Sequence, residues 1–483
     1  MKKLIALILV ALLSVTLIAC AGADSGGNDT DTAADTTTEA ADDDAGADDT
    51  TDTGNDDTAG AGGTINLWSF TDEVPNMVDR FKELNPDFPY NVEVTIISTT
   101  DGAYQPALDG ALVGGGSDAP DIFAAEAAFV LRYTQGDMSE FALPYADLGI
   151  DVDALIAEAQ IASYTVDIGT RDGQVVGLGF QATGGAVIYR RSIAQDVWGT
   201  DDPDEVAGHI GGGSASWDQF MNAAREMDAA GYSMVSGAGD LWQVARNTGS
   251  PWINADNELY IAAERLAFMD VHRELYEGGL MNDTTAWSDA WFADMAGVGA
   301  REVFAFLGPA WLINYVMAGN SGGDAPGEGT FGDWGVAVPP QGFFWGGTWL
   351  IANAQGNEEV RSGVAQLIEW ITLNSTEEGL QYKWANGTLF GEGGTKDVVA
   401  SATVMDKADG TVEFLGGQDM FDIFIPAGEY ASGTVLTQYD ESINDWFMDA
   451  STEYATGSMT REEAIEFFKQ QVASNLAVTV NFD

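Results

Sequence analysis

The chain predicts an α/β fold built as two lobes. Short runs rich in β-branched and aromatic residues alternate with segments whose apolar residues recur at helical spacing, a pattern typical of strand–helix–strand units. Beyond residue 63, where the composition changes, about 420 residues remain, which is more than one ordinary hydrophobic core accommodates. We therefore expect two lobes, each with its own sheet and covering helices.

The first expected elements follow one another closely. The β-rich run 64–70 predicts a strand, and 74–84 predicts a helix because Val74, Met77, Val78 and Phe81 share one side. Asn85-Pro86 ends that helix. The next segments alternate in the same way: we expect a strand at 92–97, a helix at 104–113 and a buried strand at 120–124.

The remaining elements are predicted by apolar runs and by helix-start patterns. The capping-box pattern occurs as Ser216-x-x-Gln219 and as Thr460-x-x-Glu463, each before a helical segment. We expect strands at 174–180, 186–189, 303–307, 334–338 and 349–352, and helices at 216–227, 258–276, 358–372 and 460–472.

The N-terminal residues predict export. Met1-Lys2-Lys3 precedes an apolar run over 4–19 that is short for a membrane-spanning helix and typical of a secretory signal. Leu17-Ile18-Ala19-Cys20 resembles a bacterial lipoprotein box, in which the cysteine is lipidated and becomes the first mature residue. We expect a lipoprotein signal peptide over 1–20 with lipid attachment at Cys20. The alternative is an ordinary signal peptide with an incidental cysteine.

Residues 21–63 predict a disordered acidic linker. They hold 13 acidic residues, no Lys or Arg, and no aromatic or large aliphatic residue. Such a segment has no apolar surface to bury and cannot offset the entropy of ordering.

The charge of the chain excludes several partners. It has 76 acidic and 19 basic residues, and without the 13 acids of the linker and the two N-terminal lysines the net charge is still about −46. Nucleic acid is excluded as a partner because phosphate binding needs a basic surface. An anionic membrane would repel this body too, so a lipid would have to anchor it.

No pattern indicates catalysis. The chain has no phosphate loop and no His/Cys cluster with metal spacing, and His209 and His272 are its only histidines. Paired carboxylates for glycoside hydrolysis carry no information among 76 acidic residues. We expect no catalytic residue, no cofactor and no metal.

Several stretches resemble one family over essentially all of residues 64–483. They are 65–73, 119–123, 172–180 with 186–191, 306–311, and 335–339 with 346–349. Their order resembles the extracellular solute-binding proteins of ABC importers, in the carbohydrate-binding branch that includes maltose-binding proteins. The resemblance implies a periplasmic-binding-protein-like fold, in which a multi-strand hinge joins two α/β lobes around a ligand cleft.

Domain boundaries and partners follow from the resemblance. Lobe one would comprise 64–181 and 301–340, and lobe two 182–300 and 341–483, with hinges near Gln181 and Gln341. The protein would be a monomer, held by its lipid on the extracytoplasmic face of the cell membrane. Its partners would be a small carbohydrate ligand and the transmembrane subunits of an ABC permease.

Candidate ligand residues are aromatic residues at strand ends or in glycine-rich loops, with two carboxylates. A sugar ring needs flat aromatic surfaces for its C–H faces and fixed polar groups for its hydroxyls. The candidates are Trp68, Phe70, Asp72, Glu126, Trp242, Trp252, Trp311, Trp345 and Trp349. For each of them a packing or surface role is the alternative, and Arg246 is interpreted as a surface ion-pair partner.

The resemblance leaves the solute open. Maltose-type members carry an aromatic residue and a charged pair after the strand at 122–123, whereas this chain has Ala124-Ala125-Glu126-Ala127-Ala128. We predict a substrate-binding lipoprotein that captures a carbohydrate, in the first place an oligosaccharide, for a permease. The alternatives are a receptor for another solute such as a polyamine, and a secreted carbohydrate-active enzyme.

Overall fold

The computed structural model describes residues 62–99 and 102–482. These residues belong to one compact unit, Thr58–Asp483. The predicted signal peptide, Cys20 and the predicted linker up to residue 61 lie outside the described residues. The predicted linker extends two residues too far, because Gly62 N donates to Pro89 O at 2.8 Å and Asn91 N donates to Gly63 O at 2.9 Å.

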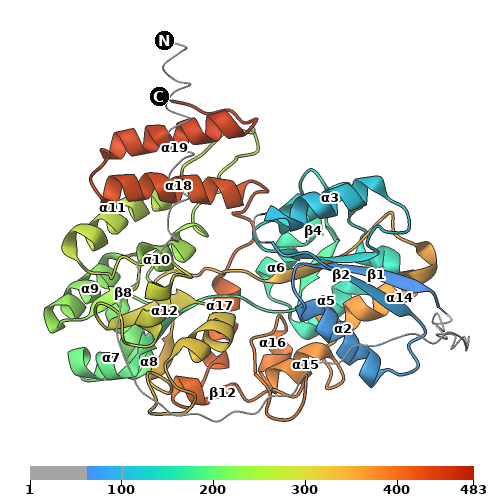
Figure 1. The fold of residues 1–483 in the computed structure, drawn as a ribbon, viewed down its shortest axis with the longest axis horizontal. Helices are drawn as coiled ribbons and strands as arrows, with labels where there is room; N and C mark the ends of the chain where they lie inside the picture. The colour runs from blue at the N-terminus through green and yellow to red at the C-terminus, as the bar shows by residue number, and fades with distance from the viewer. Residues whose placement is uncertain (1–61, 100–101, 483) are drawn as a thin grey trace, which may run out of the picture. The chain divides into compact units, whose positions relative to one another are not determined.

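The first sheet has five strands in the order β2-β1-β3-β11-β6. Its strands β1 and β2 are labelled on the right in Figure 1, and β8 of the second sheet on the left. β1 lies parallel to β2 and to β3, as the strand–helix–strand pattern predicts, whereas β11 runs antiparallel between β3 and β6. The strands are β1 (Thr64–Ser69), β2 (Asn91–Ile96), β3 (Ile122–Glu126), β6 (Gly177–Gly179) and β11 (Thr348–Ala352).

The second sheet has four strands in the order β10-β7-β9-β8. β8 is parallel to β9, and β7 is antiparallel to both β9 and β10. Every residue of the four strands is buried, which explains their continuous apolar sequences. The strands are β7 (Ala186–Arg190), β8 (Ser233–Val235), β9 (Val303–Gly308) and β10 (Trp334–Ala337).

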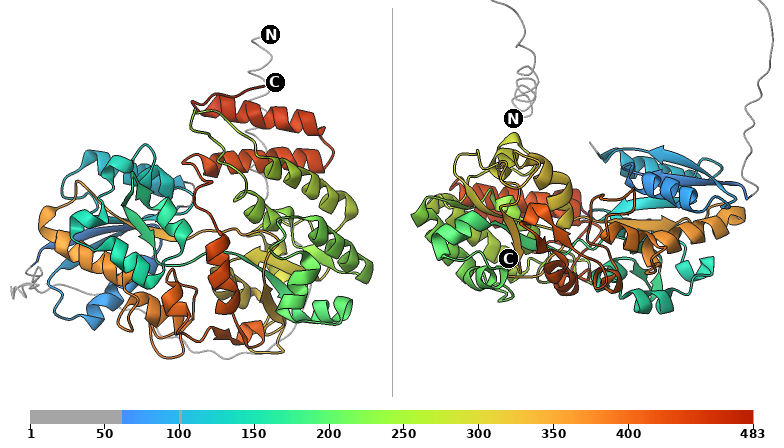
Figure 2. Two further views of the ribbon diagram at one scale, coloured as in Figure 1. Left: turned by 180° about the vertical axis from the view of Figure 1, so that it is seen from behind. Right: turned by 90° about the horizontal axis from the view of Figure 1, so that it is seen from below.

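Helices cover both sheets and divide between two lobes (Figure 2). Those of the first lobe are α2 (Glu73–Leu84), α3 (Tyr104–Gly114), α4 (Val130–Thr134), α5 (Val152–Ala159), α6 (Ser163–Ile168), α14 (Arg361–Ile368), α15 (Leu380–Ala385) and α16 (Ala402–Met405). Those of the second are α7 (Arg191–Trp198), α8 (Pro203–Ile210), α9 (Asp218–Ala230), α10 (Ala238–Ala245), α11 (Ala263–Gly278), α12 (Asp289–Met295), α13 (Ala310–Leu312), α18 (Asp440–Ala455) and α19 (Arg461–Asn475). α17 (Phe421–Tyr430) contacts elements of both lobes, namely α6 and β7.

The chain passes from one sheet to the other where the sequence predicts it, but two predicted lobe assignments are wrong. Residues 180–185 lead from β6 to β7, and residues 338–347 lead from β10 to β11. β9 and β10 pair with β7, so 303–337 belongs with lobe two. β11 pairs with β3, so 348–352 belongs with lobe one, and so do α14, α15 and α16, which were also predicted in lobe two. An apolar strand has the same sequence pattern in either sheet, and only its hydrogen-bonding neighbours decide its membership.

Helix starts follow their capping groups. Thr460 and Glu463 form the predicted capping box of α19. The corresponding prediction at Ser216 is wrong: α9 begins at Asp218 after Trp217, and the Ser216 hydroxyl accepts from Asp218 N at 3.2 Å in a local turn. α11 begins at Ala263, five residues later than predicted, because Glu258 pairs with Thr479 in extended conformation.

None of the helices within residues 62–99 and 102–482 is long and apolar enough to cross a bilayer.

Candidate functional site

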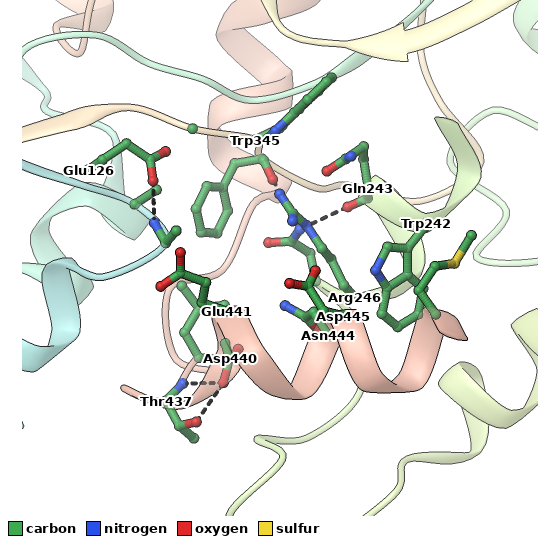
Figure 3. A pocket seen from close by; sticks show the side chains of 17 residues that line it. Glu126, Trp242, Gln243, Arg246, Trp345, Thr437, Asp440, Glu441, Asn444 and Asp445 are labelled. Carbon is green, nitrogen blue, oxygen red and sulfur yellow. Dashed lines mark hydrogen bonds between the residues drawn. The ribbon is translucent and has the colours of Figure 1, made fainter. Parts of the chain in front are cut away.

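A cavity of about 290 Å³ is lined by residues from both lobes (Figure 3). The first lobe contributes Glu126, the last residue of β3, and the two residues after it, at the carboxyl end of a parallel strand where open α/β sheets place ligands. The second lobe contributes residues of α10 and α18, and the crossing segment contributes 344–346. In Figure 3, Glu126 lies on one side of the cavity and Trp242 and Arg246 lie on the other.

Glu126 is a predicted site residue that lines the cavity. Its Oε2 accepts a hydrogen bond from Ala128 N at 2.7 Å, which fixes the carboxylate at the end of β3. Burial raises the pKa of Glu126 to about 6, although the Ala128 hydrogen bond and the charge of Arg246 act in the opposite direction. The carboxyl group is therefore held at the cavity and is accessible to a ligand donor.

Arg246 lines the same cavity, contrary to its interpretation as a surface ion-pair partner. It follows α10 directly and is half-buried, and burial lowers the pKa of its guanidinium while Glu126, Asp440 and Asp445 raise it. Among the described residues, no carboxylate lies within ion-pair distance of it. The scarcity of cations in this chain was the only sequence signal for the residue.

Three buried acceptor atoms at the cavity have no hydrogen-bond partner within the described part of the chain. They are Gln243 Oε1, Asn247 Oδ1 and Asp440 Oδ2. Their side chains are 9%, 7% and 5% exposed. A buried polar atom without a partner is costly, so this arrangement favours a ligand that donates hydrogen bonds.

Two of the predicted tryptophans, Trp242 and Trp345, line the cavity. The Trp242 ring stacks on Phe447 with centroids 5.2 Å apart, and the residue is only 5% exposed. Trp345 is half-buried and lies at the mouth, next to Gly346, whose φ of 74° suits a residue without a side chain.

Trp311 supports Trp345. The Trp311 indole N–H donates to Trp345 O at 2.9 Å, and the two rings meet edge to face with centroids 4.8 Å apart. Trp287, which is not among the predicted site residues, is 54% exposed, and its ring lies parallel to that of Trp311 with centroids 6.2 Å apart. The three tryptophans therefore form one aromatic wall, although only Trp345 of the three lines the cavity.

Trp252 and Trp349 are core residues, so their prediction as ligand contacts is wrong. Trp252 is fully buried, its N–H donates to Asn444 Oδ1 at 2.9 Å, and the Arg265 guanidinium covers its ring. Trp349 is 1% exposed and its N–H donates to Thr165 O at 2.9 Å. Neither ring presents a surface to a ligand.

Trp68, Phe70 and Asp72 lie at the end of β1 and do not line this cavity. Trp68 packs against the core around Phe123, and Phe70 contacts Tyr104 with ring centroids 5.8 Å apart. Asp72 is exposed and precedes α2. As ligand contacts these three remain predictions.

A second cavity of about 210 Å³ continues the first. It shares Glu126, Ala128 and Glu441 with it and extends toward Tyr104, Gln105 and Phe129. The shared residues place the two cavities next to one another, and the second one lies beside the start of α3.

Two further carboxyl groups with raised pKa values lie near the hinge crossing. Burial and Asp397 raise the pKa of Glu73 to about 7, and burial raises the pKa of Asp397 to about 7. Asp397 accepts from Gln181 Nε2 at 2.8 Å and from Val398 N at 2.7 Å. The two carboxyl groups repel one another when both are ionised.

Glu73→Gln is expected to stabilise the protein at pH 8 by about 1–2 kcal/mol and to have little effect at pH 5. Because the pKa of Glu73 is raised in the folded state, the folded protein holds this proton more tightly than the unfolded chain, and wild-type stability falls as pH rises from about 4.5 to about 7. Thermal unfolding of both proteins across this range measures the effect. Glu93→Gln, at an exposed strand position, is the matched control. An equal gain at both pH values would contradict the expectation.

No group of three or more His, Cys, Asp or Glu side chains within the described ranges is arranged to hold a metal ion.

Comparisons with known proteins place the chain in a family. The profile of the family described as bacterial extracellular solute-binding protein matches residues 76–411. The lactose-binding protein of Rhizobium radiobacter is 21% identical over 414 residues, which are 80% of this chain and 88% of that protein. The chain therefore belongs to the bacterial extracellular solute-binding proteins.

Solved structures confirm the fold. A crystal structure of an extracellular solute-binding protein of family 1 has a TM-score of 0.65 at 20% identity, over 85% of this chain and 99% of that one. The galacto-N-biose-/lacto-N-biose I-binding protein of the ABC transporter from Bifidobacterium longum, in complex with lacto-N-biose, has a TM-score of 0.63 at 16% identity, over 86% and 98%. The sugar-binding protein MalE from Xanthomonas citri has a TM-score of 0.60 at 15% identity, over 85% and 96%. The periplasmic-binding-protein-like fold predicted from the sequence is confirmed.

Proposed function

We propose that this chain is the substrate-binding lipoprotein of an ABC transporter and that it captures a carbohydrate, in the first place an oligosaccharide, for a membrane permease. The observation that carries the proposal is the cavity at Glu126, where the half-buried Trp345 ring lies beside unpartnered acceptors on Gln243, Asn247 and Asp440. A flat aromatic surface suits the C–H face of a sugar ring, and acceptors suit its hydroxyl donors.

The extent of the site favours a ligand of more than one sugar unit. The second cavity shares Glu126 and Glu441 with the first, so a ligand longer than one ring has room to continue toward Gln105. The names of two relatives point the same way, since one is a lactose-binding protein and another is solved with lacto-N-biose.

Ligand binding would favour closure of the lobes. Glu126 belongs to the first lobe, whereas Gln243 and Asn247 belong to the second, so a ligand that contacts all three gains most where the two sides approach. The crossings near Gln181 and Gln341 are the proposed hinges. The protein would act as a monomer without enzymatic activity, and the closed form would be presented to the permease.

Lipidation of Cys20 would hold this receptor on the extracytoplasmic face of the cell membrane. The acidic residues 21–61 would give it reach from the anchor to the permease.

A thermal-shift screen of the purified protein against neutral mono- and oligosaccharides, amino sugars and polyamines tests the proposal. A ligand at 100 times its Kd stabilises the native state by about 2.7 kcal/mol, and we expect at least one carbohydrate to do so. A panel in which polyamines shift the melting temperature and no sugar does would overturn the carbohydrate proposal. Hydrolysis of a glycan by the purified protein would instead support the enzyme alternative.

A further inference from the structure

The cavity at Glu126 carries an excess of negative charge. Four carboxylates line it, from Glu126, Asp440, Glu441 and Asp445, and Arg246 is the one cation among the lining residues described. Neutral hydroxyl groups need acceptors, but they do not need net charge. The excess therefore bears on what kind of carbohydrate the proposed receptor takes.

Glu441, on α18 of the second lobe, lines the cavity together with Glu126 of the first lobe. It raises the pKa of Glu126, after the larger effect of burial, and it also raises that of Asp445. Glu441 and Asp445 are one turn apart on α18, and like charges at this spacing destabilise a helix. The protein thus keeps Glu441 close to two other carboxylates, Glu126 of the first lobe and Asp445 of the second, at one cavity.

The surrounding cations compensate this charge only in part. The positive charge of Arg246 offsets part of the effect of burial on the pKa values of Glu126, Asp440 and Asp445. Arg265 of α11, which does not line the cavity, does the same for Asp440. The Arg265 guanidinium is occupied, because it donates to Ser250 O and Arg246 O and stacks on Trp252. Asp449 adds a further negative charge next to Asp445.

The unpartnered amide oxygens identify a second requirement of the ligand. Asn247 Nδ2 donates to Gln243 O at 2.8 Å and to Phe344 O at 3.0 Å, so the orientation of its amide is fixed and Oδ1 remains an acceptor. Gln243 Oε1 and Asp440 Oδ2 are likewise buried acceptors without partners. The ligand must therefore supply several donors, and some of these face neutral acceptors.

We propose that the ligand is an amino sugar, a carbohydrate with a free, protonated primary amine. Its ammonium group would lie among Glu126, Glu441 and Asp445, its hydroxyl groups would donate to Gln243 and Asn247, and its ring would lie against Trp345. This proposal rests on the proposed function and specifies its substrate class. A linear polyamine would also satisfy the carboxylates, and its ammonium groups could donate to the amide oxygens, but its methylene chain offers no flat ring face for Trp345.

Isothermal titration at pH 7 with matched sugars tests this. The probes are glucosamine and galactosamine and their oligomers, each compared with the N-acetylated form and with the form that has a hydroxyl in place of the amine. We expect the free amine to bind at least tenfold more tightly than either counterpart, and added salt to weaken only amine binding. Equal or tighter binding of a neutral counterpart would overturn the amino-sugar proposal and leave the carbohydrate receptor standing. Binding of polyamines alone in the thermal-shift screen would overturn both proposals, and an absence of binding across the titrated sugars would overturn the amino-sugar proposal.

Glu441→Gln separates charge recognition from general packing. Glu441 is exposed, so the substitution is not expected to disturb the fold. We expect it to weaken amine binding about tenfold and to weaken binding of a neutral counterpart much less, by about threefold at most. Asp449→Asn makes the same change of charge two turns further along α18, outside the cavity lining, and should change neither affinity more than about twofold. Equal losses in the two variants would contradict a contact between Glu441 and the amine.

Discussion

Trp349→Ala is expected to lower the free energy of unfolding by about 3–5 kcal/mol, the cost typical of truncating a buried tryptophan. The ring is 1% exposed and packs in the core of the first lobe. Its loss leaves a cavity and also removes the donor to Thr165 O. Denaturant unfolding of both proteins measures the difference.

Two comparisons separate packing from the loss of a hydrogen bond. Trp349→Phe keeps most of the ring and should cost about 1–2 kcal/mol, chiefly for the unpaired carbonyl. Trp287→Ala removes a side chain that is 54% exposed and should change stability by about 0.5 kcal/mol or less. Wild-type stability in Trp349→Ala would contradict the burial of this residue and restore it as a candidate ligand contact.

Trp345→Ala is expected to weaken ligand binding about thirtyfold, which corresponds to about 2 kcal/mol for the loss of an aromatic contact with the ligand. The ring is half-buried at the mouth of the cavity and is held there by its contact with Trp311. Titration of the best sugar from the screen measures the change in affinity. The melting temperature of the ligand-free variant should fall only slightly.

Trp217→Ala is the matched control for this variant. Trp217 is also half-buried, but it packs on Phe220 at the start of α9 and does not line the cavity. The Trp217→Ala variant should have a somewhat lower free energy of unfolding and wild-type affinity for the ligand. Unchanged affinity in Trp345→Ala would remove this ring from the site.

The local elements of the fold were predictable from residue patterns. β1 and α2 follow directly from the alternation at 64–70 and from the apolar stripe at 74–84, and the capping box of α19 is found at Thr460. Helix signals of this kind are local, since they depend on residues three or four positions apart. The failure at Ser216 has a local cause too, because a serine hydroxyl also closes a turn of its own.

The candidate site was only partly predictable. Glu126, Trp242 and Trp345 were expected and line the cavity, whereas Trp252 and Trp349 are buried. A strand end and a nearby glycine suggest exposure, but burial depends on what packs over the ring from distant parts of the chain. Gln243 and Asn247 lie in the polar segment after Trp242 and were not singled out.

The α18 residues of the site carry a local sequence signal of their own. Glu441 and Asp445 repeat like charge at a spacing of four residues, which is unfavourable in a helix without a compensating partner. Glu441 and Asp445 are more than 300 positions away from Glu126 in the chain, so the sequence did not indicate that the three carboxylates line one cavity.

The sequence by itself determined the class of fold, the order of most of its elements and the membership of the family, because these depend on local periodicity and on the order of short motifs. Only the tertiary structure decided which sheet β9, β10 and β11 join, which tryptophans reach a ligand, and that Arg246 faces carboxylates of both lobes. The physical reason is that sheet pairing and burial are set by contacts between residues far apart in the chain. A strand or a tryptophan has the same local sequence whichever partner covers it.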